Sequence, residues 1–311
     1  MRNMHKERTY GRIRRRLFKE RELWVITTFM LAWLAVICYY PMYGLIISFK
    51  RYVPGRSIAQ AQWVGLLYFR QFFSSPDFRY VIRNTLAISG LTILFGFPAP
   101  IILALLLNEM RAKLFKRVLQ TVSYLPHFIS WVVMASLLFT LLNSEGLLNR
   151  LLLNIGLIDR NISWLGEGKY FWGVLTLANI WKGVGFSSII YLSAIAGIDG
   201  ELYQAGAVDG LGRFGQVWHI ILPGIRTTVV LLGILQLGNI LNAGFEQQIL
   251  LGNNMTRQYY EVIDTYAYKY GVQLGNYSYG TAVGLMKGVI SVVLVFGANA
   301  LSRKALDTAV L

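Results

Sequence analysis

Six long apolar runs constrain this chain more than any other feature. They cover residues 23–49, 81–107, 118–142, 171–196, 221–245 and 279–301. A helix needs about 20 apolar residues to cross the hydrocarbon core of a bilayer, and every run is longer than that. Backbone polar groups in lipid must be bonded within the element, which favours helices. We therefore predict an all-α membrane protein with six transmembrane helices.

The distribution of charge sets the expected orientation. Only 14% of residues are charged, whereas a soluble domain carries about 25%. The net charge of +15 is concentrated in the first tail and in the loop after the second run. Cytoplasmic flanks of membrane helices carry such an excess, so we expect both termini in the cytoplasm. The basic tail suits anionic lipid headgroups, and no nucleic-acid partner is expected.

The predicted organisation has three parts. Residues 1–22 form a basic cytoplasmic tail, residues 23–302 form the six-helix transmembrane domain, and residues 303–311 form a cytoplasmic C-terminal tail. Within the domain, a polar loop at residues 199–223 separates the fourth and fifth helices.

This loop contains the sequence YQAGAVDGLGRFGQVWHIILPGI (residues 203–225), which is turn-rich and half-polar between apolar runs. Asp199 suits a helix N-cap, and Glu201 suits the first turn. Asp209-Gly210 is a strong turn signal. A second short helix is expected at about residues 213–220, with Pro223 in the first turn of the fifth membrane helix. The loop therefore predicts two short helices, either as a docking unit for a partner or as a plain amphipathic connector.

The same loop resembles the EAA signature of ABC importer permeases. The matching residues are QAGAVDG (204–210) and IILP (220–223). Gln204 replaces the usual acid, and Gly206 replaces an alanine, which should loosen the first short helix by up to about 1 kcal/mol. The stretches at 63–85, 124–133, 189–199 and 241–247 resemble carbohydrate-uptake permeases of the maltose-permease type, in the branch assigned to oligosaccharides or polysaccharide fragments.

The resemblance implies an obligate assembly in the cytoplasmic (inner) membrane of a bacterium. A second, related permease, two ATP-binding subunits and an extracytoplasmic substrate-binding protein would join this chain. ATP and Mg would be held by the ATPase subunits, so the chain would carry no cofactor and would not itself be an enzyme. The sequence contains no G-x-x-x-x-G-K-[ST] phosphate loop, no His/Cys cluster with metal-ligand spacing and no Ser-His-Asp arrangement. Ten residues of the polar loop would contact the ATPase subunit: Glu201, Leu202, Tyr203, Gln204, Ala205, Gly206, Asp209, Gly210, Phe214 and Pro223.

Polar residues inside the apolar runs are candidates for a substrate pathway, because such groups are costly in lipid. They are Trp131, Lys182, Asn239, Asn242, Glu246 and Lys287. Aromatic faces and polar groups suit a sugar, and the two lysines would neutralise a uronate. Packing roles remain open: the asparagines as interhelical hydrogen bonds, Trp131 in the core, and Lys287 as an ion-pair partner of Glu246.

Other functional classes remain as alternatives. An ion-coupled secondary transporter usually places acids in the middle of the membrane, and the predicted spans contain none there. A membrane enzyme would have only Asp199, Glu201 and Asp209 as a candidate cluster, and helix capping explains these residues more simply. An ABC importer for a solute other than carbohydrate is the remaining alternative.

Overall fold

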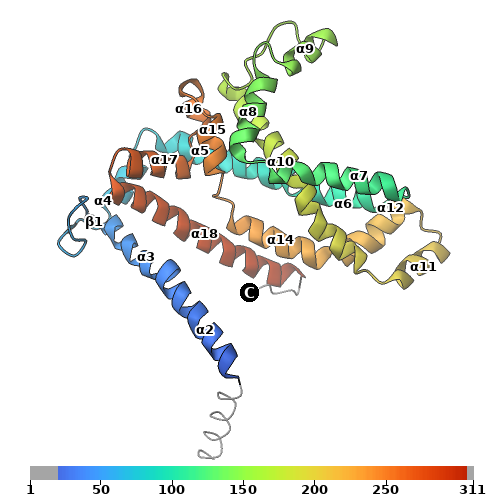
Figure 1. The fold of residues 1–311 in the computed structure, drawn as a ribbon, viewed down its shortest axis with the longest axis horizontal. Helices are drawn as coiled ribbons and strands as arrows, with labels where there is room; N and C mark the ends of the chain where they lie inside the picture. Colours follow the sequence, from blue (N-terminus) through green and yellow to red (C-terminus); the bar gives the residue numbers. More distant parts are fainter. Residues whose placement is uncertain (1–19, 307–311) are drawn as a thin grey trace, which may run out of the picture.

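The computed structural model describes residues 20–306, which are mainly helical (Figure 1). Five helical segments are long and apolar enough to cross a membrane: Arg21–Phe49, Phe78–Asn108, Trp131–Asn154, Gly168–Ala196 and Tyr277–Ala300. A sixth candidate is a bent pair, Arg213–Gly224 followed by Arg226–Gly238, with a bend of 61°. The predicted all-α membrane fold is thus confirmed, with five to six candidate spans in the described residues.

Several of these segments combine more than one helical element. The first comprises α2 (Arg21–Leu34), the π turn η1 (Ala35–Tyr39), α3 (Tyr40–Met42) and the 3₁₀ segment η2 (Tyr43–Phe49), and the second comprises α5 (Phe78–Leu91), the π turn η3 (Thr92–Gly96) and α6 (Pro98–Asn108). The fourth is the single helix α10 (Gly168–Ala196), and the last is α18 (Tyr277–Leu306). The predicted tail at 303–311 therefore begins as helix up to Leu306, while residues 1–19 and 307–311 lie outside the described part.

The third apolar run is not one helix, contrary to the prediction for 118–142. Helix α7 (Lys113–Tyr124) ends in a 3₁₀ turn (Leu125–Phe128), and α8 begins at Trp131 and ends at Leu142. Pro126 in the turn cannot donate a backbone hydrogen bond. Ser130 has extended backbone and its hydroxyl accepts from Val133 N at 3.3 Å, which caps a new helix. The chain therefore changes direction inside this run, and α9 (Leu147–Asn154) continues beyond α8 (Figure 1).

The fifth run is also interrupted. Pro223 lies in α13 (Leu222–Gly224), before the bend at Ile225, so its predicted place in the first turn of the membrane helix is wrong. The helix itself, α14, spans only Arg226–Gly238. Residues 239–244 are non-helical, Gly244 has φ of +84°, and α15 (Phe245–Leu251) follows. Glycines and asparagines are poor helix formers, and four of them fall between 238 and 244, which accounts for the break.

The chain between the fifth and sixth spans is packed, although the sequence predicted only a loop there. It contains α15, the 3₁₀ turn η6 (Asn254–Thr256), α16 (Arg257–Tyr260), α17 (Ile263–Tyr268) and the π turn η7 (Lys269–Gln273). Tyr266 and Ile263 are fully buried against Phe72 of α4 (Leu67–Phe73) and Val81 of α5. A small antiparallel hairpin, β1 (Lys50–Arg51) and β2 (Gln62–Trp63), lies beside them. One end of the molecule is therefore a compact cap of short elements.

The opposite end carries the predicted polar loop. Helix α11 (Gly200–Val208) and α12 (Arg213–Gln216) lie together there, beyond the ends of α6, α7 and α10 (Figure 1). A core cluster of Ala104, Tyr191, Ile195, Ile221 and Ile225 joins this loop to the spans. The loop is thereby attached to three membrane segments at once.

Candidate functional site

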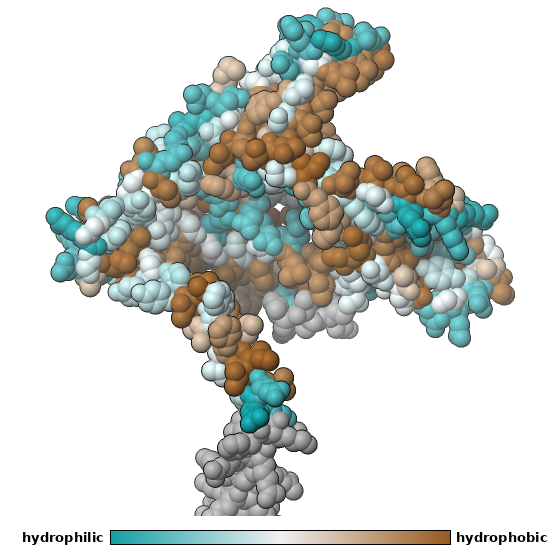
Figure 2. Space-filling view, in the orientation of Figure 1, coloured by the Kyte–Doolittle hydropathy of each residue, from teal (hydrophilic) through white to brown (hydrophobic). Residues whose placement is uncertain are grey.

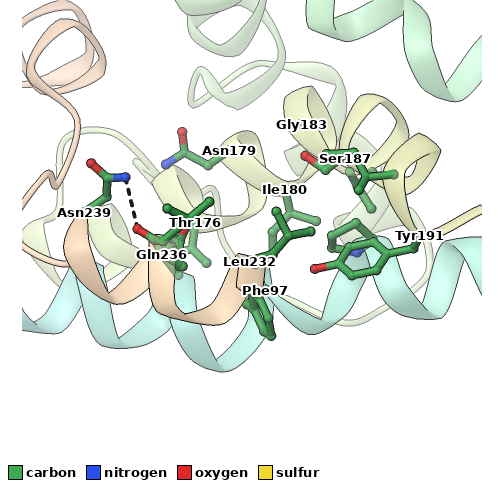
Figure 3. Close-up of a pocket in the computed structure, with 16 residues that line it drawn as sticks. Phe97, Thr176, Asn179, Ile180, Gly183, Ser187, Tyr191, Leu232, Gln236 and Asn239 are labelled. Atoms are coloured by element: carbon green, nitrogen blue, oxygen red, sulfur yellow. Dashed lines mark hydrogen bonds between the residues drawn. The ribbon is translucent and has the colours of Figure 1, made fainter. Parts of the chain in front are cut away.

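A cavity of about 300 Å³ lies between the second, fourth and fifth spans (Figure 3). The space-filling view shows hydrophilic residues gathered in a hollow at the middle of the molecule, surrounded by hydrophobic surface (Figure 2). The cavity is lined by Thr92, Gly96, Phe97, Pro100, Thr176, Asn179, Ile180, Gly183, Val184, Ser187, Ile190, Tyr191, Leu232, Leu235, Gln236 and Asn239. Its lining combines apolar walls with hydroxyl and amide groups, the composition expected of a small-molecule site.

Helix α10 supplies most of the polar lining. Thr176, Asn179, Gly183, Ser187 and Tyr191 recur every three or four residues and so lie along one face of this helix. Asn179 Oδ1 accepts from Gln247 Nε2 at 3.4 Å, which joins α10 to α15. These residues were not predicted from the sequence, although their helical spacing within an apolar run is a signal that identifies them.

Three of the predicted pathway residues meet at the break after α14. Asn239 lines the cavity, and its Oδ1 accepts from Asn242 Nδ2 at 2.9 Å. Asn242 Oδ1 in turn accepts from Lys287 Nζ on α18. The prediction placed the two asparagines on a membrane helix; the structure places them just beyond its end.

The predicted ion pair between Lys287 and Glu246 is wrong. Lys287 Nζ binds Asp264 of α17 instead, at 2.5 Å from Oδ1 and 2.7 Å from Oδ2. Glu246 is exposed in the first turn of α15 and makes no ion pair with any described residue. Asp264 was not predicted from the sequence, because its contact with α18 joins residues 23 positions apart that belong to different helices.

Lys182 and Trp131 form a separate group at the break between α7 and α8. Lys182 Nζ donates to the carbonyl oxygens of Pro126 at 3.4 Å, His127 at 2.7 Å and Ile129 at 2.5 Å. The ammonium also lies 5.9 Å from the centroid of the Trp131 ring. Lys182 therefore supplies a donor to carbonyl groups at the helix break, where the Pro126 carbonyl also accepts from Ile129 N at 3.2 Å.

A second ion network lies within the compact cap. Arg257 binds Asp77 at 2.9 Å and Glu261 at 3.1 Å, and Lys269 lies 3.4 Å from Glu261. Burial and the hydrogen bond that Tyr270 donates to Asp77 raise the pKa of Tyr270 to about 12. These residues were not predicted, and they fix α16 and η7 against the start of α5.

The polar loop folds as the sequence predicted at its first helix. The Asp199 side chain accepts from Glu201 N at 3.0 Å and caps α11. At the other end, Leu211 N donates to Gly206 O and Gly210 N donates to Ala207 O, which is a Schellman motif. Gly210 has φ of +76°, the left-handed conformation that this motif requires. The Asp209-Gly210 turn is therefore a helix C-terminus held by backbone bonds.

The loop residues divide into a buried and an exposed set. Gly206 is buried, and a Cβ there would lie 2.8 Å from Ile220 Cδ1, so the glycine permits close packing of α11 rather than simply loosening it. Tyr203 packs beside the Ile221 cluster. The outer surface is unusually apolar for a loop: Phe214 is 93% exposed and Val208 is 88% exposed. Also exposed are Glu201, Leu202, Gln204, Ala205, Asp209, Gly210 and Pro223.

Comparison with known proteins identifies the family. The sequence profile described as "Binding-protein-dependent transport system inner membrane component" matches residues 96–307. The chain belongs to this family.

The membrane permease family contains relatives of high similarity. Protein LplB of Bacillus subtilis (strain 168) is 42% identical over 93% of this chain and 90% of its own length. The polygalacturonan/rhamnogalacturonan transport system permease protein YteP of the same organism is 44% identical over 86% of this chain and 83% of its own. A chain of a bacterial ABC transporter that imports the acidic polysaccharide alginate has a TM-score of 0.87 at 38% identity, covering 95% of this chain and 99% of that chain.

This membership places the candidate sites on a multi-pass component of the bacterial inner membrane. The matched region, 96–307, includes the polar loop and all the cavity lining except Thr92. The alginate transporter was also solved in complex with a pentasaccharide-bound periplasmic protein, and that structure has the same similarity to this chain. Both candidate sites thus lie in the part of the chain that defines the family.

Proposed function

We propose that this chain is the transmembrane permease subunit of an ATP-driven, binding-protein-dependent importer for carbohydrate, specifically for an oligosaccharide or a polysaccharide fragment. The observation that carries the proposal is the similarity to the alginate transporter over 95% of the chain, joined to a cavity lined by amides and hydroxyls. Sugar hydroxyls both donate and accept hydrogen bonds, and the amide and hydroxyl side chains that line the cavity can also do both.

An acidic substrate is the favoured class. Lys182 is bonded to neutral carbonyl oxygens and touches no carboxylate among residues 20–306, so its positive charge is not cancelled by them. Lys287 is different, because Asp264 neutralises it. Of the two intramembrane lysines that the sequence offered for a uronate, Lys182 is the one that leaves a net positive field in the pathway.

The loop at 199–223 would couple the chain to ATP hydrolysis. Two partner subunits would bind ATP and Mg, and the exposed apolar side chains of Leu202, Val208 and Phe214 would fill a groove on one of them. Gln204 would supply a neutral hydrogen bond where a related chain has an acid. Motion of α11 would reach the spans through Tyr203 and the buried Ile221 cluster, because an element must contact both sides to transmit a change.

The remaining partners follow from the orientation. With both termini in the cytoplasm, α11 and α12 face the ATPase and the compact cap of short helices faces outward, where a binding protein would deliver substrate. A second homologous permease would supply the other half of the translocation pathway, forming a heterodimer.

The test is uptake by the assembled complex in proteoliposomes. We expect uptake of an oligouronide only with ATP and loaded binding protein, and ATP hydrolysis stimulated by that protein. Uptake that continues without ATP and stops with a protonophore would identify an ion-coupled transporter instead. Stimulated hydrolysis with another solute but with no oligosaccharide would keep the importer and overturn the carbohydrate assignment.

A further inference from the structure

One chain of hydrogen bonds connects the cavity wall to an ion pair on two other helices. It runs from Asp264 to Lys287, from Lys287 to Asn242 and from Asn242 to Asn239, which lines the cavity. The chain joins α17, α18 and the break after α14. Lys287 and Asp264 are largely shielded, with side chains only 14% and 26% exposed.

The charges at one end fix the direction of every bond in the chain. A lysine ammonium has donors and no acceptor, so the atom of Asn242 that faces Lys287 must be its oxygen. The Asn242 nitrogen then faces Asn239, and the atom of Asn239 that it meets must also be oxygen. The Asn239 nitrogen is therefore left on the other side of its amide.

The opposite end of the chain requires the same direction. Asn239 Nδ2 donates one hydrogen to the Leu235 carbonyl at 3.2 Å, and a carbonyl can only accept. Figure 3 shows the Asn239 nitrogen directed toward the other lining residues and its oxygen directed away. Because an amide nitrogen carries two hydrogens, one donor remains available to a ligand in the cavity.

We propose that Asp264, Lys287 and Asn242 are positioning residues that hold Asn239 as a fixed hydrogen-bond donor, and that this donor selects substrates bearing carboxylates. A carboxylate only accepts, so it suits a fixed donor and is repelled by a fixed acceptor. A sugar hydroxyl can match either. This inference rests on the proposed function and assigns its substrate class to particular residues.

The test reverses the direction of the chain while keeping its ion pair. The double variant Lys287→Glu with Asp264→Lys retains opposite charges but presents an acceptor to Asn242, which turns the Asn242 amide over and sets its oxygen against Asn239 Oδ1. Asn239 then either turns over and loses its bond to the Leu235 carbonyl, or loses its bond to Asn242, so in both cases it is no longer held as a fixed donor. Uptake is measured in proteoliposomes with an oligouronide and with the same oligosaccharide after its carboxylates are reduced to hydroxymethyl groups. One binding protein is used throughout, so its own preference cancels when variant and wild-type rates are compared.

We expect the ratio of acidic to neutral uptake to fall about tenfold in the double variant, the loss typical of a charged hydrogen bond. Asn239→Leu, which leaves the ion pair intact, should lower the same ratio, and it decides the matter if the double variant does not assemble. Lys169→Gln, which breaks an exposed ion pair with Glu167, is the matched control and should change neither rate.

Three results would overturn the inference. The first is wild-type uptake of both sugars by the double variant, which is expected if the ion pair is purely structural, and the second is an unchanged ratio in Asn239→Leu. Wild-type import of the neutral sugar alone would also overturn it. Import of neither sugar by the wild-type complex would count against the proposed function and not against the hydrogen-bond chain.

Discussion

Replacing Gly210 tests the proposed coupling role of the polar loop, because the energetic cost of the substitution can be worked out from the backbone alone. Gly210 has φ of +76°, and a Cβ built there meets nothing within 4 Å. A side chain at this position is therefore not opposed by packing. The only penalty is the left-handed conformation that the Schellman motif requires.

That penalty is about 1–2 kcal/mol for an ordinary L-residue such as alanine. It corresponds to a loss of roughly 5- to 30-fold in the population of the native loop. Valine is worse, because β-branched residues rarely adopt positive φ, whereas asparagine tolerates this region. We expect the order of function Gly ≥ Asn > Ala > Val.

The assay is the ATPase rate stimulated by loaded binding protein, together with uptake, in reconstituted complexes whose assembly is checked by co-purification. Gly210→Val should lose most of the stimulation. Gly200→Ala is the matched control: Gly200 also meets nothing within 4 Å, but it lies in the first turn of α11, where alanine is favourable. If Gly210→Val retains full stimulation and full uptake, the loop is only a connector and the coupling argument fails.

Three further predictions concern the assembly, the helix break and the orientation. The purified chain alone should not hydrolyse ATP, and robust turnover without partner subunits would contradict the assignment of ATP to those subunits. Lys182→Met should leave carbonyls at the α7–α8 break without donors, at a cost of about 1–3 kcal/mol each. Lys182→Met should therefore lower the thermal-inactivation temperature and reduce uptake, whereas Lys182→Arg, which keeps charged donors, should leave both at the wild-type value. Equal behaviour of the two variants would show that the Lys182 ammonium does not stabilise the break. In a Cys38→Ser background, a cysteine at Asp159 should react with an impermeant reagent on intact cells and one at Gln204 should not, and the reverse pattern would invert the topology.

The sequence determined the class of fold, because the length of an apolar run and its need for internal hydrogen bonds are local properties. It also determined the first helix of the polar loop, since a cap at Asp199 and a left-handed glycine at 210 act over a few residues. The resemblance to the EAA signature further indicated which loop, the one between the fourth and fifth spans, would contact an ATPase subunit.

Tertiary structure alone decided where polar groups meet. Lys287 pairs with Asp264, not with Glu246, because α17 packs against α18, and no local signal reports that contact. In the same way, Lys182 donates to carbonyl oxygens 53 to 56 residues away, at the helix break. The proline at this break is visible in the sequence, but the lysine that donates to the carbonyls there is not. Long-range electrostatic partners depend on how helices are arranged in space, and an apolar run carries no record of which side chain from another helix will lie beside it.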